Sequence, residues 1–302
     1  MHLGSYQTTT AHSLFQGVMQ MICAWQEYLK ILPHWMRSGV DKIGREHLQE
    51  LRMRVGQPPK LIMQNRCTAL DRIVSSEDII YVINTASKYS PWAAATIGKG
   101  YITAAGGHRI GVCGETVTNN GTVTGIRTAT SLCVRVARDF PDLALPAQKE
   151  KGSVLIIGPP GSGKTTLLRD LIRQRSVIEK GSISVLDERG EIFPVVDGKA
   201  CFLTGENTDI LTGCGKSQGL DILLRTMGPT CIAVDEITEA EDCSALLSAG
   251  WSGVSLIATA HAGNAIDLYT RPVYKPLIEK HLFDVLLVLQ LNKSWTMEPI
   301  RV

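Results

Sequence analysis

Residues 158–166 constrain this chain more than any other stretch. They read Gly-Pro-Pro-Gly-Ser-Gly-Lys-Thr-Thr and fit the phosphate-binding pattern G-x-x-x-x-G-K-[ST]. An apolar run of strand type precedes them at 153–157, and apolar residues at helical spacing follow at 167–173. Backbone N–H groups of such a loop point at phosphate oxygens, and the helix N-terminus adds positive potential. The sequence therefore predicts a nucleotide site formed by Gly158, Pro159, Pro160, Gly161, Ser162, Gly163, Lys164, Thr165 and Thr166.

Two residues of this loop have predicted roles of their own. Lys164 is expected to reach the β- and γ-phosphates as a point charge, and the Thr165 hydroxyl to ligate Mg²⁺.

The chain after the loop alternates between predicted strands and helices. A strand at 182–186 ends in the carboxylate-rich segment 187–191, and a strand at 231–234 ends in Asp235 and Glu236. Sites in such α/β folds form at the C-terminal edge of the sheet, so both sets of carboxylates are expected beside the nucleotide. One carboxylate of the Asp235–Glu236 pair would hold Mg²⁺, and the next would polarise the attacking water.

His261 follows a third predicted strand, at 254–260. It is either a structural residue at a strand end or a sensor of the γ-phosphate, since imidazole hydrogen-bonds phosphate in either charge state. We favour the sensor, because His261 ends the third strand of an apparent nucleotide-binding core, where a sensor of the γ-phosphate is needed.

The first half of the chain has a different pattern, which predicts a small α+β domain with an antiparallel sheet. Residues 51–63 indicate a hairpin, and residues 75–83 a helix capped by Ser75 or Ser76. Another short helix is expected from Pro91. Strands are expected over 101–137, with a tight turn at 120–121.

The domain boundaries follow from these patterns. Residues 140–150 contain two prolines and are expected to link a domain at 28–145 to a nucleotide-binding domain at 146–302. Residues 1–27 are expected to be a disordered tail or the start of a helix, with Met19 or Met21 as alternative start sites. An amphipathic helix is predicted at 18–32, either packed on its own domain or docking on a membrane partner.

Composition excludes several classes of protein. The net charge of +2 gives no bulk case for nucleic-acid binding, and the eight cysteines contain no C-x-x-C pair that would indicate zinc. No run reaches the apolar length of a membrane span. We therefore expect a soluble protein whose membrane association goes through a partner.

The arginines of the predicted N-terminal sheet have two interpretations. Arg109, Arg127, Arg135 and Arg138 are either solvated surface residues, or some of them reach a neighbouring subunit's γ-phosphate as arginine fingers.

Taken in order, these elements resemble the secretion ATPase superfamily of type II and type IV secretion and pilus motors. Within it, the chain is similar to the stage III sporulation protein AA family of endospore-forming bacteria. The resemblance is carried by residues 50–58, 106–111, 185–192 and 258–263, together with the loop at 158–166.

The resemblance implies a RecA-like P-loop ATPase core behind a PAS-like N-terminal domain, assembled as a hexamer with ATP and Mg²⁺ bound. The implied role is to power or assemble a membrane channel during endospore formation. The implied partners are membrane proteins of that channel, and the implied location is the mother-cell cytoplasm, at the membrane through those partners. No nucleic acid is expected.

The resemblance also assigns residues by position. Glu236 is the Walker B carboxylate, His261 is the histidine-box residue, and Glu191 falls where pilus motors have a water-activating glutamate. The aspartate box departs from the motor pattern, because Asp187-Glu188 replaces Glu-Asp and Arg189 replaces a proline. The water-activating residue therefore stays open among Glu188, Glu191 and Glu236.

Other positions follow in the same way. Asp235 stands where many motors have glycine and is expected to add a Mg²⁺ contact, and Arg109 and Arg127 lie in the region from which such motors present arginines. Two other functions stay open: a RecA-like nucleic-acid translocase, motivated by Arg52, Arg54, Arg109 and Arg127, and a nucleotide-dependent scaffold with little turnover.

Overall fold

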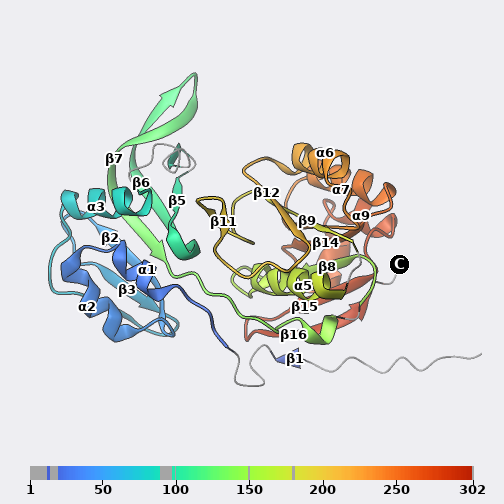
Figure 1. Ribbon diagram of the computed structural model, residues 1–302, viewed down its shortest axis with the longest axis horizontal. Coiled ribbons are helices and arrows are strands. Elements are labelled where there is room, and N and C mark those ends of the chain that lie inside the picture. The colour runs from blue at the N-terminus through green and yellow to red at the C-terminus, as the bar shows by residue number, and fades with distance from the viewer. Residues whose placement is uncertain are drawn as a thin grey trace, which may run out of the picture. The chain divides into compact units, whose positions relative to one another are not determined.

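The computed structural model describes residues 12–13, 20–88, 97–98, 100–148, 150–178 and 181–300, which form two compact units (Figure 1). The N-terminal unit comprises Met21–Asp139 and Pro194–Phe202. The C-terminal unit comprises Phe140–Phe193 and Leu203–Val302 with Met1–Gln20. The sequence predicted two continuous domains, at 28–145 and 146–302. In the structure, a short hairpin from the second half of the chain, Pro194–Phe202, belongs to the N-terminal unit.

A six-stranded antiparallel sheet forms the N-terminal unit, in the order β4-β3-β2-β7-β6-β5. The predicted hairpin is confirmed, since β2 pairs antiparallel with β3. The turn between β6 and β7 is confirmed as well, with φ of +49° at Asn120 and +78° at Gly121, as a two-residue hairpin turn of this twist requires. The bounds are β2 Leu48–Arg54, β3 Lys60–Met63, β4 Cys67–Ala69, β5 Tyr101–Thr103, β6 Arg109–Asn119 and β7 Thr122–Arg135.

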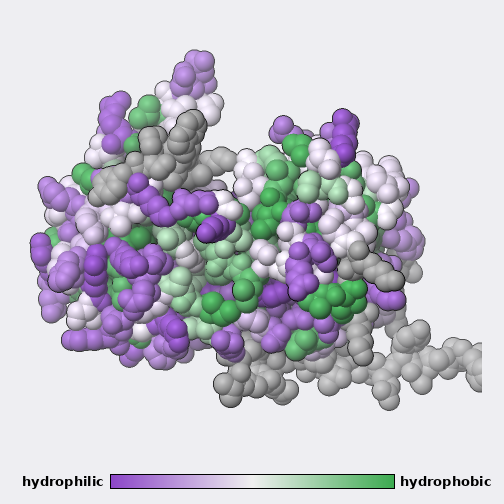
Figure 2. Space-filling model, in the orientation of Figure 1, coloured by the Kyte–Doolittle hydropathy of each residue, from purple (hydrophilic) through white to green (hydrophobic). Residues whose placement is uncertain are grey.

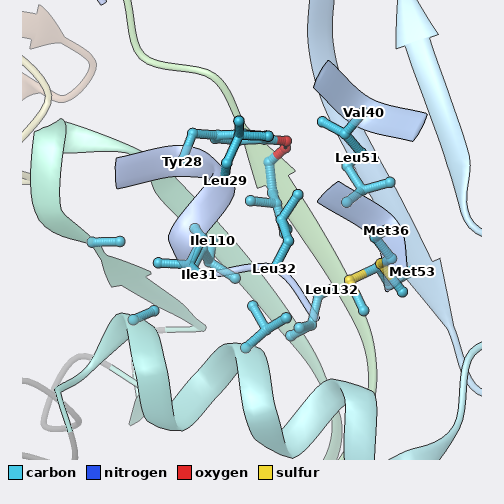
Figure 3. Close-up of a cluster of buried hydrophobic side chains, with 14 of the residues drawn as sticks. Tyr28, Leu29, Ile31, Leu32, Met36, Val40, Leu51, Met53, Ile110 and Leu132 are labelled. Atoms are coloured by element: carbon cyan, nitrogen blue, oxygen red, sulfur yellow. The ribbon is translucent and has the colours of Figure 1, made fainter. Parts of the chain in front are cut away.

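Three helices supply the other half of this unit's core: α1 Trp25–Lys30, α2 His34–Ile43 and α3 Ser76–Ala86. The sheet residues that alternate inward, such as Leu51 and Met53, pack against side chains such as Leu32 and Met36 (Figure 3). The surface of this unit in Figure 2 is mostly hydrophilic, as expected when the apolar side chains are turned inward.

The helix predicted at 18–32 is shorter in the structure, where α1 covers only Trp25–Lys30. Ile22 forms an isolated bridge with Asp139, so the described chain is extended there and the helix begins only at Trp25. Pro33 then separates α1 from α2, which the sequence analysis did not predict.

Two other local predictions have different outcomes. Ser75 caps α3 in a capping box with Asp78, as predicted. The helix expected from Pro91 lies outside the described residues.

His108 is buried in this unit in its neutral form. Its Nε2 lies 3.0 Å from the carbonyl oxygen of Ala24, and the backbone N–H of Ala137 donates to Nδ1 at 3.1 Å. An imidazole that accepts at Nδ1 has no room for a second proton there. Burial lowers the pKa of His108 from 6.5 to about 4.

We therefore expect the free energy of unfolding to fall as the pH drops from 6.5 to about 4. In this range the unfolded chain binds the proton and the folded chain does not, which amounts to about 3 kcal/mol for this group. Urea unfolding at pH 7 and pH 4 of the wild type and of His108→Gln measures it, because the variant keeps all other titrating groups. An equal loss in both proteins would contradict the prediction.

A mostly parallel eight-stranded sheet forms the C-terminal unit, in the order β1-β16-β15-β8-β14-β13-β9-β12. The six strands from β15 to β12 run parallel, and β16 and β1 continue the sheet antiparallel. The strand β1 corrects part of the tail prediction for residues 1–27, since His12 and Ser13 pair with β16. The bounds are β1 His12–Ser13, β8 Val154–Ile157, β9 Ile183–Asp187, β12 Thr208–Thr212, β13 Cys231–Ile237, β14 Ser255–Ala260, β15 Val285–Leu289 and β16 Ser294–Pro299.

Helices lie on both faces of this sheet, which explains its continuously apolar strands. On one face, Leu155 and Ile157 of β8 belong to a core that also contains Leu220, Leu246 and Leu277 from three helices. The long helix α5 contacts β8, β13 and β14. The bounds are α5 Lys164–Ile178, α6 Lys216–Thr226, α7 Ala240–Trp251, α8 Ala265–Thr270 and α9 Lys275–Glu279, with the short strands β10 Val195–Val196 and β11 Lys199–Ala200 in the hairpin. The predicted α/β fold class is confirmed.

The segment predicted to be the linker is anchored on α5. The buried carboxylate of Asp170 on α5 accepts the backbone N–H groups of Asp142 and Ala144, at 3.1 and 2.7 Å. A 3₁₀ helix, η3, follows at Leu145–Ala147. None of the described helices is long and apolar enough to cross a membrane.

Candidate active site

The phosphate-binding loop joins β8 to α5 in the conformation that its glycines allow. Gly161 and Gly163 have φ of +74° and +106°, which residues with a Cβ rarely adopt. The Ser162 hydroxyl is buried and has no hydrogen-bond partner among the described residues. The loop leads directly into the 15-residue helix α5, whose first N–H groups face the same region. These features fit the phosphate groups of a nucleotide.

Lys164 uses all three of its ammonium protons. Its Nζ donates to the carbonyl oxygens of Gly158 and Pro159, at 2.8 and 3.1 Å, and lies 3.1 Å from Nδ1 of His261. Because an ammonium group only donates, Nδ1 of His261 accepts and its Nε2 carries the proton. Burial lowers the pKa of Lys164, and the charges of Asp235 and Glu236 oppose the shift.

Thr165 connects the loop to β13. Its hydroxyl donates to Oδ2 of Asp235 at 2.8 Å, and the Thr259 hydroxyl of β14 donates to the other oxygen of the same carboxylate. The structure thus brings together the two residues predicted to ligate Mg²⁺. No cluster of three or more His, Cys, Asp or Glu side chains suited to a metal occurs in the described ranges. Two oxygen ligands fit Mg²⁺, which takes its remaining ligands from phosphates and water.

A bulge in β13 sets the backbone conformation of Glu236. The register against β14 shifts between Val234 and Ile237, and Glu236 has φ of +54°. Such a φ is uncommon for a non-glycine residue and is found preferentially at functional sites. The Thr259 hydroxyl accepts the backbone N–H of Glu236 at 2.8 Å, so one buried threonine fixes both members of the Asp235–Glu236 pair.

Both carboxylate oxygens of Glu236 are engaged. Nε2 of His261 donates to Oε1 at 2.6 Å, and Nη1 of Arg189 donates to Oε2 at 2.9 Å. Burial alone would raise the pKa of Glu236, but the His261 hydrogen bond and the Arg189 charge outweigh it and lower the pKa. Glu236 is therefore ionised at neutral pH and held in one place.

Asp187 and Glu188 have separate roles at the end of β9. Asp187 is buried, and its carboxylate accepts the backbone N–H groups of Glu191, Ile192 and Phe193 at 2.8–3.0 Å. The Asp187 carboxylate therefore fixes the turn that follows β9. The Glu188 carboxylate has a different partner, because its Oε2 lies 3.0 Å from Nζ of Lys216.

A hollow at this edge of the sheet collects most of the predicted carboxylates. Its lining consists of Asp187, Glu188, Arg189, Glu191, Lys216, Asp235 and Glu236. All three candidates for the water-activating residue border the same space.

Sequence reasoning missed four residues of this region. Thr259 gave one signal, as a polar residue inside an apolar strand. Lys216, Tyr274 and Lys293 gave no signal in the sequence. In the structure, the Tyr274 hydroxyl accepts the backbone N–H of His261 at 3.2 Å, and Lys293 donates to the carbonyl oxygen of Gly161.

Comparison with known proteins establishes the family. The model for "Sporulation stage III, protein AA" matches residues 25–299. The stage III sporulation protein AA of Bacillus subtilis (strain 168) is 37% identical over 281 residues, or 89% of this chain and 92% of that protein. The chain belongs to the stage III sporulation protein AA family.

Two solved structures share the fold of this chain. The pilus retraction motor PilT with bound ADP has a TM-score of 0.59 at 16% identity, over 88% of this chain and 82% of that one. The ATPase DotB of Legionella pneumophila has a TM-score of 0.53 at 18% identity, over 84% of this chain and 74% of that one. The predicted RecA-like P-loop fold is confirmed.

The two predicted arginine fingers lie in the N-terminal unit. The Arg109 guanidinium stacks over the Tyr101 ring at 3.9 Å, and Arg127 pairs with Glu115 at 3.3 Å, with both side chains of this pair exposed. Their predicted role in a neighbouring subunit's site stays a prediction.

Proposed function

We propose that this chain hydrolyses ATP with Mg²⁺, as a secretion-type motor that powers or assembles a membrane channel during endospore formation. The observation that supports this most is the hydrogen bond between Thr165 and Asp235, because it joins the phosphate-binding loop to the strand that ends in Glu236. Phosphoryl transfer to water requires groups of this kind: a hydroxyl and a carboxylate for Mg²⁺, here Thr165 and Asp235, and a second carboxylate for the water, here Glu236.

Each residue of this set has a proposed task. Residues 158–166 hold the phosphates, and Lys164 turns from its loop carbonyls to the β- and γ-phosphate oxygens. Thr165 and Asp235 hold Mg²⁺, which would neutralise charge on those oxygens. His261, which contacts both Lys164 and Glu236, reports whether Lys164 is engaged by phosphate.

The water-activating residue is one of three carboxylates. Glu236 is the best placed by its strained backbone and fixed side chain, and Glu188 and Glu191 border the same hollow. Hydrolysis of this kind rests on positioning and charge neutralisation, so a carboxylate held in one orientation is what the reaction needs.

A low-turnover scaffold is the second candidate, and one observation favours it. All three protons of Lys164 and both oxygens of Glu236 are engaged within the chain, so turnover requires these contacts to exchange. In this alternative, nucleotide binding changes the chain's contacts with its partners and hydrolysis is incidental.

The proposed assembly follows the family. A homo-hexamer in the mother-cell cytoplasm would work at the membrane through membrane proteins of the channel, with no nucleic acid involved.

The test measures phosphate release and particle mass together, with ATP and Mg²⁺ and with EDTA in place of Mg²⁺. The motor predicts Mg²⁺-dependent hydrolysis by a particle six times the mass of one chain. Tight binding without turnover in that particle would favour the scaffold. No binding at all would contradict both, and stimulation by DNA or RNA that weakens steeply with salt would indicate a translocase.

The same assay extends to Arg109 and Arg127, which we propose act in a neighbouring subunit's site. Arg127→Ala subunits keep the phosphate loop, and Lys164→Ala subunits keep the arginine. Mixing the two inactive variants should restore part of the activity, because hybrid sites contain both groups. No recovery at any mixing ratio would count against the role of Arg127.

A further inference from the structure

Lys216 is a buried cation at a place that disfavours cations. It is the first residue of α6, and its side chain is only 7% exposed. The positive end of a helix dipole destabilises a lysine there, and a buried ammonium needs partners. Helix stability therefore does not explain why a lysine occupies this position. The explanation lies in the groups that Lys216 contacts.

The two partners of Lys216 differ in what they do. The carboxylate of Asp242 lies 3.4 Å away and caps α7, where it accepts the backbone N–H groups of Thr238 and Glu239. The carboxylate of Glu188 lies closer, at 3.0 Å, and its side chain is 42% exposed. Lys216 thus joins one carboxylate with a structural role to one that borders the hollow beside Glu236.

The charges around the hollow show why Glu188 needs such a partner. Five carboxylates and two cations line it. Like charges in one site repel one another and turn apart unless a fixed positive charge holds them. The second cation, Arg189, is 58% exposed and pairs with Glu236, so Lys216 is the buried cation that faces Glu188.

We propose that Lys216 is a positioning residue for hydrolysis, which holds Glu188 toward the reacting water while Glu236 is held by Arg189 and His261. This inference rests on the proposed ATPase function. It also makes Glu188 a contributor to water activation and the link between Lys216 and the chemistry.

The test is a double-mutant cycle on kcat in the full chain. Lys216→Met keeps the length of the side chain and removes its charge, and Glu188→Gln removes the charge that Lys216 holds. Each is expected to lower kcat by about 10- to 100-fold, the usual cost of a misplaced catalytic group, with KM for ATP within about 3-fold of wild type. The double variant should lose no more than the stronger single one, because both changes remove one interaction.

Two further variants separate positioning from structure. Lys216→Arg keeps the charge and should recover at least part of kcat. Asp242→Asn keeps an acceptor for the cap of α7 and removes only the structural partner's charge, so its kcat should stay within about 3-fold of wild type. Thermal unfolding and binding of a fluorescent ATP analogue show that each variant is folded.

Each outcome bears on the inference. Losses that add in the double variant, a normal kcat in Glu188→Gln, or an equal loss in Asp242→Asn would overturn it while Lys164-dependent hydrolysis remained. An absence of Lys164-dependent hydrolysis in the wild type would overturn the proposed function, and this inference with it.

Discussion

Replacement of Lys164 by alanine is expected to lower kcat/KM for ATP hydrolysis by about 1000-fold, the upper end of the loss found when one charge-stabilising donor is removed. The ammonium group is the one positive side chain of the phosphate loop, and it is buried. The variant loses the contact to the phosphates and the contact to His261 together. Phosphate release and equilibrium binding of an ATP analogue measure the two consequences separately.

Two controls sharpen the Lys164 experiment. Lys164→Met keeps most of the side-chain volume, so a loss equal to that of the alanine variant assigns the effect to charge. Lys293→Ala removes the second lysine that contacts the loop, through the carbonyl oxygen of Gly161. We expect it to weaken ATP binding by less than about 10-fold, because its main contact is to the backbone and not to the phosphates. Near-normal turnover in Lys164→Ala would refute the site.

The edge of the sheet that carries the candidate site could be predicted because its residues follow strands, directly or after the phosphate-binding loop. The strands before residues 158, 187, 235 and 261 are short apolar runs, and the structure places all four in neighbouring parallel positions. Parallel strands end at one edge of a sheet. The strand pattern was therefore enough to predict that Lys164, Asp235, Glu236 and His261 lie close together.

The side-chain partners could not be predicted, because they depend on contacts between distant segments. Asp187 looked the same in the sequence as Glu188, yet it binds the backbone of its own turn. Lys216 lies 28 residues from Glu188 in the chain, and only the packing of α6 beside β9 brings them together. The helix α2 was not predicted, because the short helix α1 ends before Pro33 and α2 begins directly after it.

Replacement of Glu236 by glutamine should preserve ATP binding and lower kcat by about 100- to 1000-fold, the range expected when a positioned catalytic group loses its charge. The amide keeps the size of the carboxylate, and its oxygen still accepts the Nε2–H of His261. Its NH₂ group, however, faces Arg189 as a second donor and releases that guanidinium. The variant therefore lacks both the charge that would polarise water and the ion pair that fixes its position.

Single-turnover hydrolysis and equilibrium binding distinguish the possible roles of Glu236. A dissociation constant for ATP within about 3-fold of wild type, with slow single-turnover hydrolysis, is the result expected of a residue that acts on water in the transition state. Loss of ATP binding instead would mean that Glu236 supports the bulge and its strained φ of +54° rather than the reaction. Thr259→Val provides the matched comparison, because it removes the hydroxyl that fixes the bulge and leaves the carboxylate of Glu236 intact. If Thr259→Val impairs binding while Glu236→Gln does not, then the geometry of the bulge serves nucleotide and metal binding, and the Glu236 charge serves hydrolysis.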